Sequence, residues 1–197
     1  MPDPRPSPVV RLQHRRNRTP TGKRTATPAR QAAAYFAFGR QANQSGRKQR
    51  GEWLGPGGVP YAHEAVLAWV QRQARQYEHT FQALLSVPQA RLTGADYARA
   101  LEAAGSLAEW RLVAHNDTHY SHAHVLFFRD QRLDKAQFSA WQRQVRQALA
   151  VLEEKRLAAP EQALAPAAAP ELAAAGELAA AATLCEEARM GHSLAWD

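Results

Sequence analysis

The chain has very little cysteine, and this scarcity excludes several classes of protein. Cys185 is the only cysteine among 197 residues, so the chain has neither an internal disulfide framework nor a Cys-x-x-Cys metal motif. A single thiol fits a reducing compartment, and we expect a cytoplasmic protein. No apolar run approaches the roughly 20 residues that cross a bilayer, and residues 1–10 lack the apolar core of a signal peptide. We therefore expect no membrane partner.

Glycine-rich phosphate loops are also missing. The sequence contains neither Gly-x-Gly-x-x-Gly nor Gly-x-x-x-x-Gly-Lys-Ser/Thr, the two loops that cradle nucleotide phosphates. We therefore expect no nucleotide as a cofactor or energy source.

Acidic residues are scarce in the first quarter of the chain. Residues 1–50 contain twelve lysines and arginines but one acidic residue, Asp3, whereas residues 153–197 contain three basic and eight acidic residues. A basic segment favours a polyanion, most simply a nucleic acid held through its phosphates. The alternative is a solvated basic tail that binds nothing.

Hydrophobic patterning predicts an α+β fold, in which helices pack mainly on one face of an antiparallel β-sheet. Residues 1–26 are expected to form a basic strand and loop, residues 7–155 the main domain, and residues 156–197 a tail or helix rich in Ala, Pro and Glu. Strands are predicted at 7–13 and 78–88, in a hairpin within 110–129, and helices at 27–39, 61–77, 93–105 and 134–159. Residues 51–60 are expected to be a turn-rich connector.

Histidine is concentrated in the predicted hairpin. Four of the eight histidines lie between Trp110 and Arg129, in a segment with an apolar run on each side of a polar turn. Because side chains alternate along a strand, the imidazoles of His115, His122 and His124 would share one face of the sheet. Three imidazoles on one face predict a metal site, and an exposed His-rich loop is the alternative. His119 lies in the middle of the turn and is not included in the predicted site.

A tyrosine and a group of cations lie upstream of the histidines. Tyr35 is near the end of the 27–39 helix, and the residues that follow it include Arg40, Arg47, Lys48 and Arg50. A metal on three neutral imidazoles can polarise a phosphoryl oxygen, and a nearby tyrosine can then attack the phosphorus. The cations would grip a nucleic-acid strand. A packing role for the aromatic ring of Tyr35 is the alternative.

Asp117 follows the first histidine of the predicted site by two positions. If it continues the strand pattern, its carboxylate would orient one imidazole through the second ring nitrogen or accept a proton. Ligation by nitrogen alone suits Zn²⁺, Mn²⁺ or Ni²⁺, so these residues do not determine the metal.

The histidine pattern resembles the third motif of plasmid mobilisation relaxases. These are HUH endonucleases, a group that includes the T-DNA border endonuclease. The resemblance rests on His122-Ala123-His124, preceded by His115-Asn-Asp117-Thr. The strand VVRL and the later AAAYFAFGR resemble the first motif of the same family, and the likeness covers roughly residues 7–155.

The resemblance implies the fold of these nucleases, metal ligation by His115, His122 and His124, and Mg²⁺ or Mn²⁺ as the metal, with Zn²⁺ or Ni²⁺ as alternatives. It implies that Tyr35 cuts one DNA strand at an origin of transfer, keeps the 5′ phosphate and leaves a free 3′ hydroxyl. Asp117 matches the acidic residue of the motif. Accessory mobilisation proteins would be partners, because the chain lacks the helicase or primase part that many relaxases carry.

The pattern departs from the family at one place and leaves other readings open. Relatives often have a histidine five residues after the first ligand, whereas this chain has Tyr120, which is an alternative nucleophile. The alternative functions are a rolling-circle replication initiator, a transposase, and a non-catalytic nucleic-acid-binding accessory protein on a relaxase-like scaffold. In a further alternative, the metal only ties two strands together.

Overall fold

The computed structural model describes residues 7–41, 46, 48–105, 107, 109–117 and 120–159. The chain divides into two units, Met1–Ala159 and Pro160–Asp197, and all of the described structure belongs to the first unit. Most of the predicted tail therefore lies outside the described residues. No helix in the described part of the chain has both the length and the apolar character needed to cross a membrane.

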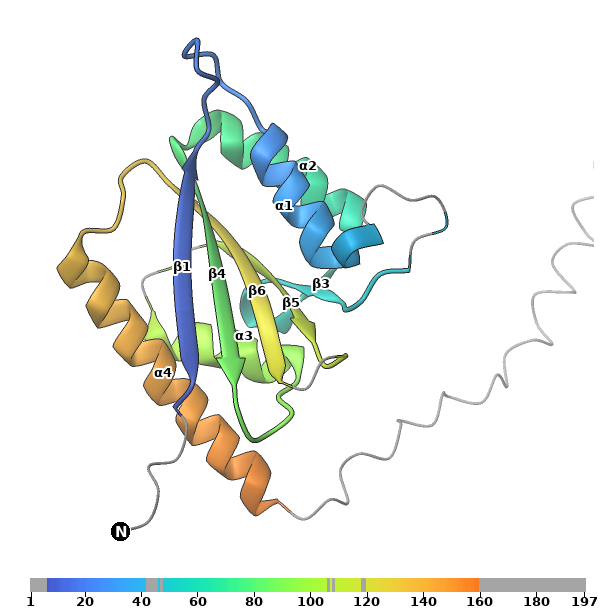
Figure 1. Cartoon of the computed structure of the whole chain (residues 1–197), viewed down its shortest axis with the longest axis vertical. Coiled ribbons are helices and arrows are strands. Elements are labelled where there is room, and N and C mark those ends of the chain that lie inside the picture. Colours follow the sequence, from blue (N-terminus) through green and yellow to red (C-terminus); the bar gives the residue numbers. More distant parts are fainter. Residues whose placement is uncertain are drawn as a thin grey trace, which may run out of the picture. The chain divides into compact units, whose positions relative to one another are not determined.

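Strands and helices follow the order that the sequence predicts, with two short strands added (Figure 1). The strands are β1 (Val9–Arg16), β2 (Trp53–Leu54), β3 (Pro60–Tyr61), β4 (His79–Val87), β5 (Trp110–His115) and β6 (Ser121–Arg129). The helices are α1 (Thr27–Phe38), α2 (His63–Gln76), α3 (Gly94–Ala104) and α4 (Lys135–Ala158), with the 3₁₀ turns η1 (Gly39–Gln41) and η2 (Pro56–Gly58).

Within the described residues, the strands form one six-stranded sheet in the order β1-β4-β6-β5-β2-β3. Every neighbouring pair is antiparallel. The predicted α+β class, antiparallel sheet and histidine hairpin are therefore confirmed. β6 lies between β4 and β5, so the strand that carries His122 and His124 is hydrogen-bonded along both edges.

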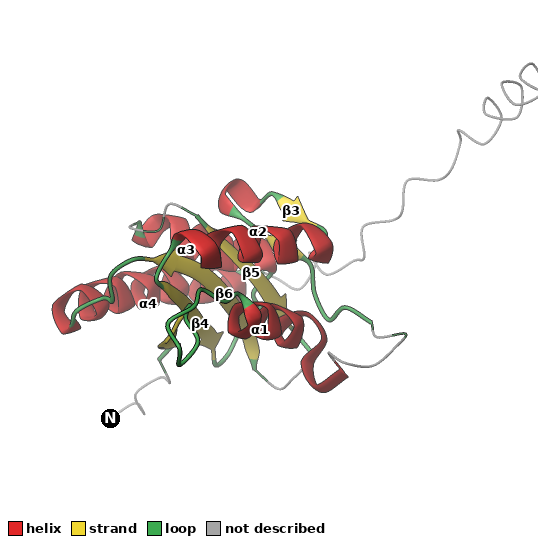
Figure 2. Ribbon diagram, turned by 90° about the horizontal axis from the view of Figure 1, so that it is seen from above, coloured by secondary structure: helices red, strands yellow, loops and turns green. Residues whose placement is uncertain are grey.

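Helices cover both faces of the sheet (Figure 2). The sequence pattern instead predicts helices mainly on one face. One core packs α3 and α4 against side chains such as Phe81, Val125 and Phe127. The other packs α1 and α2 against the opposite face, where Val113, Leu126 and Phe128 point. The continuous burial of Val125–Phe128 shows why, because only a strand covered on both faces buries four consecutive side chains.

The predicted connector at 51–60 contributes two strands to the sheet. β2 and β3 have two residues each, too few for an alternating pattern to be visible in the sequence. Trp53 on β2 is fully buried, and its indole nitrogen donates a hydrogen bond to Nδ1 of His63 at 3.2 Å. This contact ties β2 to the start of α2.

Capping residues set the helix boundaries largely as the sequence predicts. Thr93 and Asp96 form a reciprocal capping box at the start of α3, and Asp134 begins α4 in the same way. α1 begins at Thr27, with Ala26 in the cap position. It ends at Gly39, whose φ of 61° favours glycine.

α1 and α2 leave one side of their sheet face open. They pack over β2, β5 and β6, whereas side chains of β1 on the same face, including Arg11 and Gln13, are exposed. Figure 1 shows α1 and α2 lying beside β1 rather than over it. The open part of the sheet therefore borders α1, the helix that carries Tyr35.

Candidate metal centre

His115, His122 and His124 come together on the sheet face that α1 and α2 cover. β5 and β6 pair in a register that places His115 opposite His122, and His124 is one alternation further along β6. One ligand atom from each ring lies within 4.8 Å of the others. The ring of His115 is fully buried, and those of His122 and His124 are half-buried. The cluster could bind a metal ion, as the sequence predicts.

Two ring nitrogens already have the separation that a shared ion needs. Nδ1 of His115 lies 3.3 Å from Nε2 of His122. Metal–nitrogen bonds of about 2.0–2.1 Å at a tetrahedral angle place two ligand nitrogens roughly 3.4 Å apart. The other nitrogen of His122, Nδ1, faces the carbonyl oxygen of Tyr120 at 3.2 Å. A backbone carbonyl at that position holds a ligand histidine with its other ring nitrogen toward the ion.

The surroundings of the cluster favour the neutral form of two of its imidazoles, those of His115 and His124. Burial, with the neighbouring Arg50 and His122, lowers the pKa of His115 to about 4. Burial, with the neighbouring His115 and His122, lowers the pKa of His124 to about 3. Only neutral imidazole offers a nitrogen lone pair, so both rings remain ligands well below neutral pH.

α1 reaches the cluster through Phe36. The phenyl ring of Phe36 stacks on the ring of His124, with centroids 4.2 Å apart and planes 14° apart. The backbone of Phe36 raises the pKa of His115, which partly opposes the lowering of that pKa by burial. Nε2 of His115 is buried and has no complete hydrogen bond within the described residues. The helix therefore packs directly on two of the three imidazoles.

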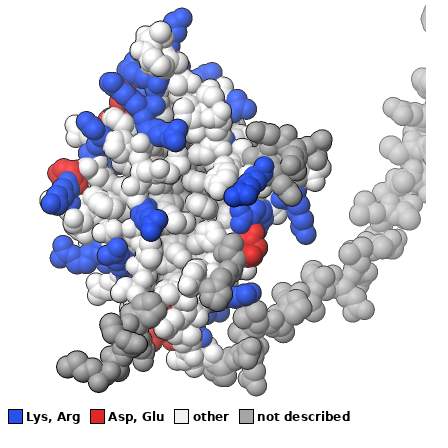
Figure 3. Space-filling view, viewed as in Figure 1, with Lys and Arg blue, Asp and Glu red and all other residues white. Residues whose placement is uncertain are grey.

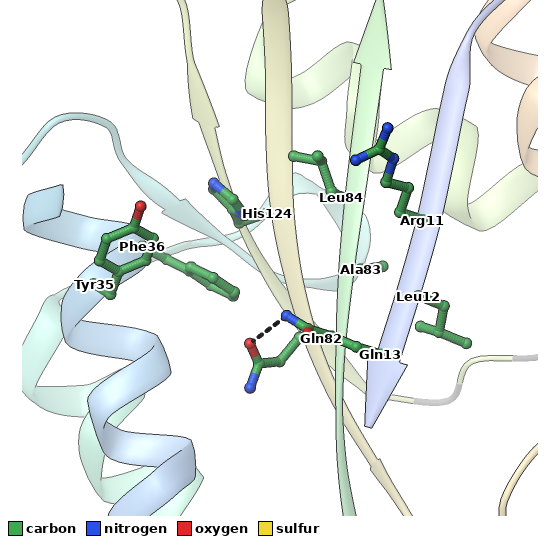
Figure 4. Close-up of a pocket in the computed structure, with 9 residues that line it drawn as sticks. All are labelled: Arg11, Leu12, Gln13, Tyr35, Phe36, Gln82, Ala83, Leu84 and His124. Atoms are coloured by element: carbon green, nitrogen blue, oxygen red, sulfur yellow. Dashed lines mark hydrogen bonds between the residues drawn. The ribbon is translucent and has the colours of Figure 1, made fainter. Parts of the chain in front are cut away.

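Tyr35 lines the same cavity as His124 (Figure 4). The cavity has a volume of about 480 Å³ and opens between α1 and the uncovered side of the sheet. The tyrosine side chain is 53% exposed, so its phenol is accessible. Strand residues Arg11, Gln13, Gln82 and Leu84 line the rest, and the amide of Gln13 donates to that of Gln82 at 3.3 Å.

Asp117 makes a contact that differs from the expected one. Its carboxylate accepts two hydrogen bonds from Arg50, at 2.7 Å from Nε and 2.8 Å from Nη2. The guanidinium of Arg50 lies against Gly39, where a Cβ atom would come within 2.9 Å of Nη1. Arg50 therefore joins the end of α1 to the turn after β5. The predicted bond from the carboxylate to an imidazole is not among the described contacts.

The other predicted cations are placed only in part. Arg40 in η1 and Lys48 are exposed to solvent, as a nucleic-acid contact requires. Arg47, also predicted to bind nucleic acid, lies outside the described residues, as does His119.

The sequence did not reveal a polar network behind the histidines. The hydroxyl of Ser121 donates to Oδ1 of Asn116 at 2.7 Å and accepts from the phenol of Tyr97 at 3.1 Å. It also accepts from the backbone N–H of Leu92 at 3.2 Å. These bonds fasten Asn116 and Ser121 to Leu92 and to Tyr97 of α3. No motif identifies such a network, because its members are spread from position 92 to position 121.

Comparison with models of known protein families, with curated proteins and with solved structures found no match to this chain.

Proposed function

We propose that this chain is a metal-dependent endonuclease that nicks single-stranded DNA through Tyr35, in the manner of the plasmid mobilisation relaxases. The observation that carries the proposal is the shared cavity: an accessible phenol and a metal-ligating imidazole, Tyr35 and His124, line one opening beside the histidine cluster. Strand cleavage by a tyrosine needs a nucleophile and an electrophilic metal at the same phosphate.

His115, His122 and His124 would hold the ion, with Mg²⁺ or Mn²⁺ as the proposed metal and Zn²⁺ or Ni²⁺ as alternatives. When bound, a divalent ion supplies Lewis-acid polarisation of a phosphoryl oxygen. Nitrogen ligands from one rigid hairpin leave the open positions that a substrate oxygen requires.

In the proposed reaction the phenol oxygen of Tyr35 forms a bond to phosphorus, and the bond from phosphorus to the 3′ oxygen breaks. The phenol proton passes to solvent, and the leaving 3′ oxygen takes up a proton to become a free hydroxyl. The protein stays joined to the 5′ phosphate. Arg50 lies close enough to Tyr35 for their charges to interact, so its guanidinium would stabilise the developing phenolate and the phosphate charge.

The DNA strand would lie on the open side of the sheet. Arg11, Gln13 and Gln82 offer one cation and two amides there, and a cavity of about 480 Å³ is within the range of about 300–1,000 Å³ that small-molecule pockets occupy. The exposed Arg40 and Lys48 would contact phosphates, together with Arg47. An origin of transfer as the target, accessory mobilisation proteins as partners and a cytoplasmic setting belong to the same proposal.

The test combines the full chain with single-stranded DNA from its own mobile element, with Mn²⁺, with Mg²⁺ or with a chelator. The readout is a protein–DNA adduct that survives denaturing electrophoresis. We expect an adduct that requires metal and is absent from Tyr35→Phe and His122→Ala. Tyr120→Phe is the matched control, because Tyr120 is also 53% exposed and adjoins the cluster.

An adduct that persists in Tyr35→Phe and disappears in Tyr120→Phe would assign the nucleophile to Tyr120. Tight binding of cognate DNA without any adduct would replace nicking by the non-catalytic accessory role.

A further inference from the structure

A second cavity with cationic walls lies at the end of β1. It has a volume of about 400 Å³ and is lined by four basic side chains, His14, Arg16, His79 and Arg132. They come from three parts of the fold: β1, the start of β4, and the connection from β6 to α4. We refer to these four side chains as the basic cavity.

The basic cavity is separate from the histidine cluster. His79 and Ser86 are seven positions apart on β4, and Ser86 pairs with His122 of the cluster. An odd separation places the two side chains on opposite faces of the sheet, and seven residues span roughly 23 Å. Consistent with this, the ring of His14 lies 5.4 Å from that of Phe81, which belongs to the core under α4. A ligand in the basic cavity would not touch the metal centre.

Carboxylates only partly balance the charge of this region. Glu78 lies next to the cavity, but Arg16 and Arg18 hold its carboxylate at 2.6 and 2.9 Å and Arg24 at 3.2 Å. These arginines lower the pKa of Glu78 to about 2, so one negative charge is already shared among three cations. Nδ1 of His79 faces the carbonyl oxygen of Asp130 at 3.1 Å, which leaves its Nε2 for another partner.

The positive charge extends beyond the cavity along an exposed surface. The segment after β1 folds back on itself, with a β-bridge between Arg18 and Arg24, and carries the exposed Lys23 at its turn. Figure 3 shows lysine and arginine side chains gathered at the top of the view, where β1 ends and this segment begins. A row of exposed cations suits a chain of phosphates better than one small anion.

We propose that the basic cavity binds a phosphate group of a nucleic-acid backbone, at a second contact distant from the metal centre. The guanidinium of Arg132 and the imidazoles of His14 and His79 would contact one phosphate. Lys23 and the arginines around Glu78 would contact its neighbours. This binding needs neither metal nor Tyr35 and does not depend on the proposed nicking reaction.

The test measures equilibrium binding of a fluorescent single-stranded oligonucleotide of about 20 nucleotides to the full chain, without added metal and at several salt concentrations. The site variants are Arg132→Ala and the double variant His14→Gln/His79→Gln. Arg146→Ala, an exposed arginine of α4 that does not line the cavity, is the control with the same loss of charge.

We expect Arg132→Ala and the double variant to weaken binding about 3- to 10-fold for every sequence tested. Arg132→Ala should also reduce the slope of log affinity against log salt by about 0.7, the value for one phosphate contact on a single strand. Arg146→Ala should change affinity less than 2-fold. Equal effects of Arg132→Ala and Arg146→Ala would overturn the proposal.

A second arm separates the nucleic-acid backbone from free phosphate as the source of the ligand. Inorganic phosphate is titrated while the ring resonances of His14 and His79 are followed by NMR, and the oligonucleotide is titrated in a parallel sample. Shifts of both rings with the oligonucleotide support the proposal. Shifts with inorganic phosphate alone, or with neither ligand, overturn it. Adduct formation is scored separately, so failure of nicking leaves this result intact.

Discussion

The phenyl ring of Phe36 and the imidazole of His124 stack with their centroids 4.2 Å apart, although 88 positions separate them in the sequence. This contact fixes the orientation of one candidate ligand, and it also fixes where α1 presents the adjacent Tyr35. The candidate metal site and the proposed nucleophile thus both depend on this pair of rings for their position.

Replacing Phe36 by leucine should clearly reduce the affinity for metal but should reduce the free energy of unfolding only slightly. A similar volume is kept, so the free energy of unfolding should fall by less than about 1.5 kcal/mol, while the stacking surface is lost. We expect a several-fold weaker affinity for Mn²⁺ by isothermal titration. Phe128→Leu is the control, because Phe128 belongs to the same core but contacts Trp69. Equal loss of affinity in both variants would contradict a specific role of the stack.

The ion pair of Arg50 and Asp117 should contribute little to the free energy of unfolding, but its loss should slow adduct formation. Both side chains are partly exposed, at 29% and 46%, so we expect a coupling free energy below about 1 kcal/mol in a double-mutant cycle by urea unfolding. Because Arg50 lies close enough to Tyr35 for their charges to interact, Arg50→Gln should reduce the rate of adduct formation at least 10-fold. Asp117→Asn, which keeps the cation, should reduce it less. A larger loss in Asp117→Asn would instead support the carboxylate as proton acceptor.

Stability of the metal-free chain should decline as the pH falls below about 6.5. His115 and His124 have pKa values of about 4 and 3 in the folded chain, below the ordinary histidine value. The unfolded chain therefore binds more protons than the folded chain in this window, and folding weakens by about 1.4 kcal/mol per pH unit for each histidine. Urea unfolding between pH 7.5 and 4.5 measures the slope.

The variant His124→Phe should reduce that slope, since one titrating ring is removed and an aromatic neighbour of Phe36 is kept. An unchanged slope would place the responsible groups elsewhere in the chain.

Removing the hydroxyl of Ser121 should destabilise the fold. Ser121→Ala leaves the buried N–H of Leu92 and the phenol of Tyr97 without their described acceptor, which costs about 1–3 kcal/mol. Ser139 is exposed on α4, and Ser139→Ala should change the unfolding free energy by less than about 0.5 kcal/mol. A loss below that limit in Ser121→Ala would show that water replaces the hydroxyl.

The histidine cluster was predictable because strand geometry alone generates it. A hairpin with a short turn and an alternation of two places His115, His122 and His124 on one face, whatever the rest of the fold does. Tyr35 could be assigned to a helix, but its position beside His124 depends on tertiary packing through Phe36. The resemblance to a relaxase motif, rather than the local pattern, linked the two.

Other features depended on contacts that no local pattern contains. The two-residue strands β2 and β3 exist because β5 offers a free edge to Trp53 and Leu54. The carboxylate of Asp117 accepts hydrogen bonds from the guanidinium of Arg50 rather than from an imidazole. Arg50 is 67 positions earlier in the sequence, so no local pattern indicates this pair. The basic cavity joins four residues spread from position 14 to position 132.

The position of β6 in the sheet makes the two halves of the candidate site unequal in stiffness. β6 is hydrogen-bonded along both edges, so its amide hydrogens should exchange with solvent only when the whole domain unfolds. α1 packs on the sheet through small and aromatic side chains, and we expect it to open locally at a lower free energy. The candidate ligands His122 and His124 therefore lie on a strand that we expect to stay fixed in the folded domain. The helix that bears Tyr35 is the part of the candidate site that we expect to open locally.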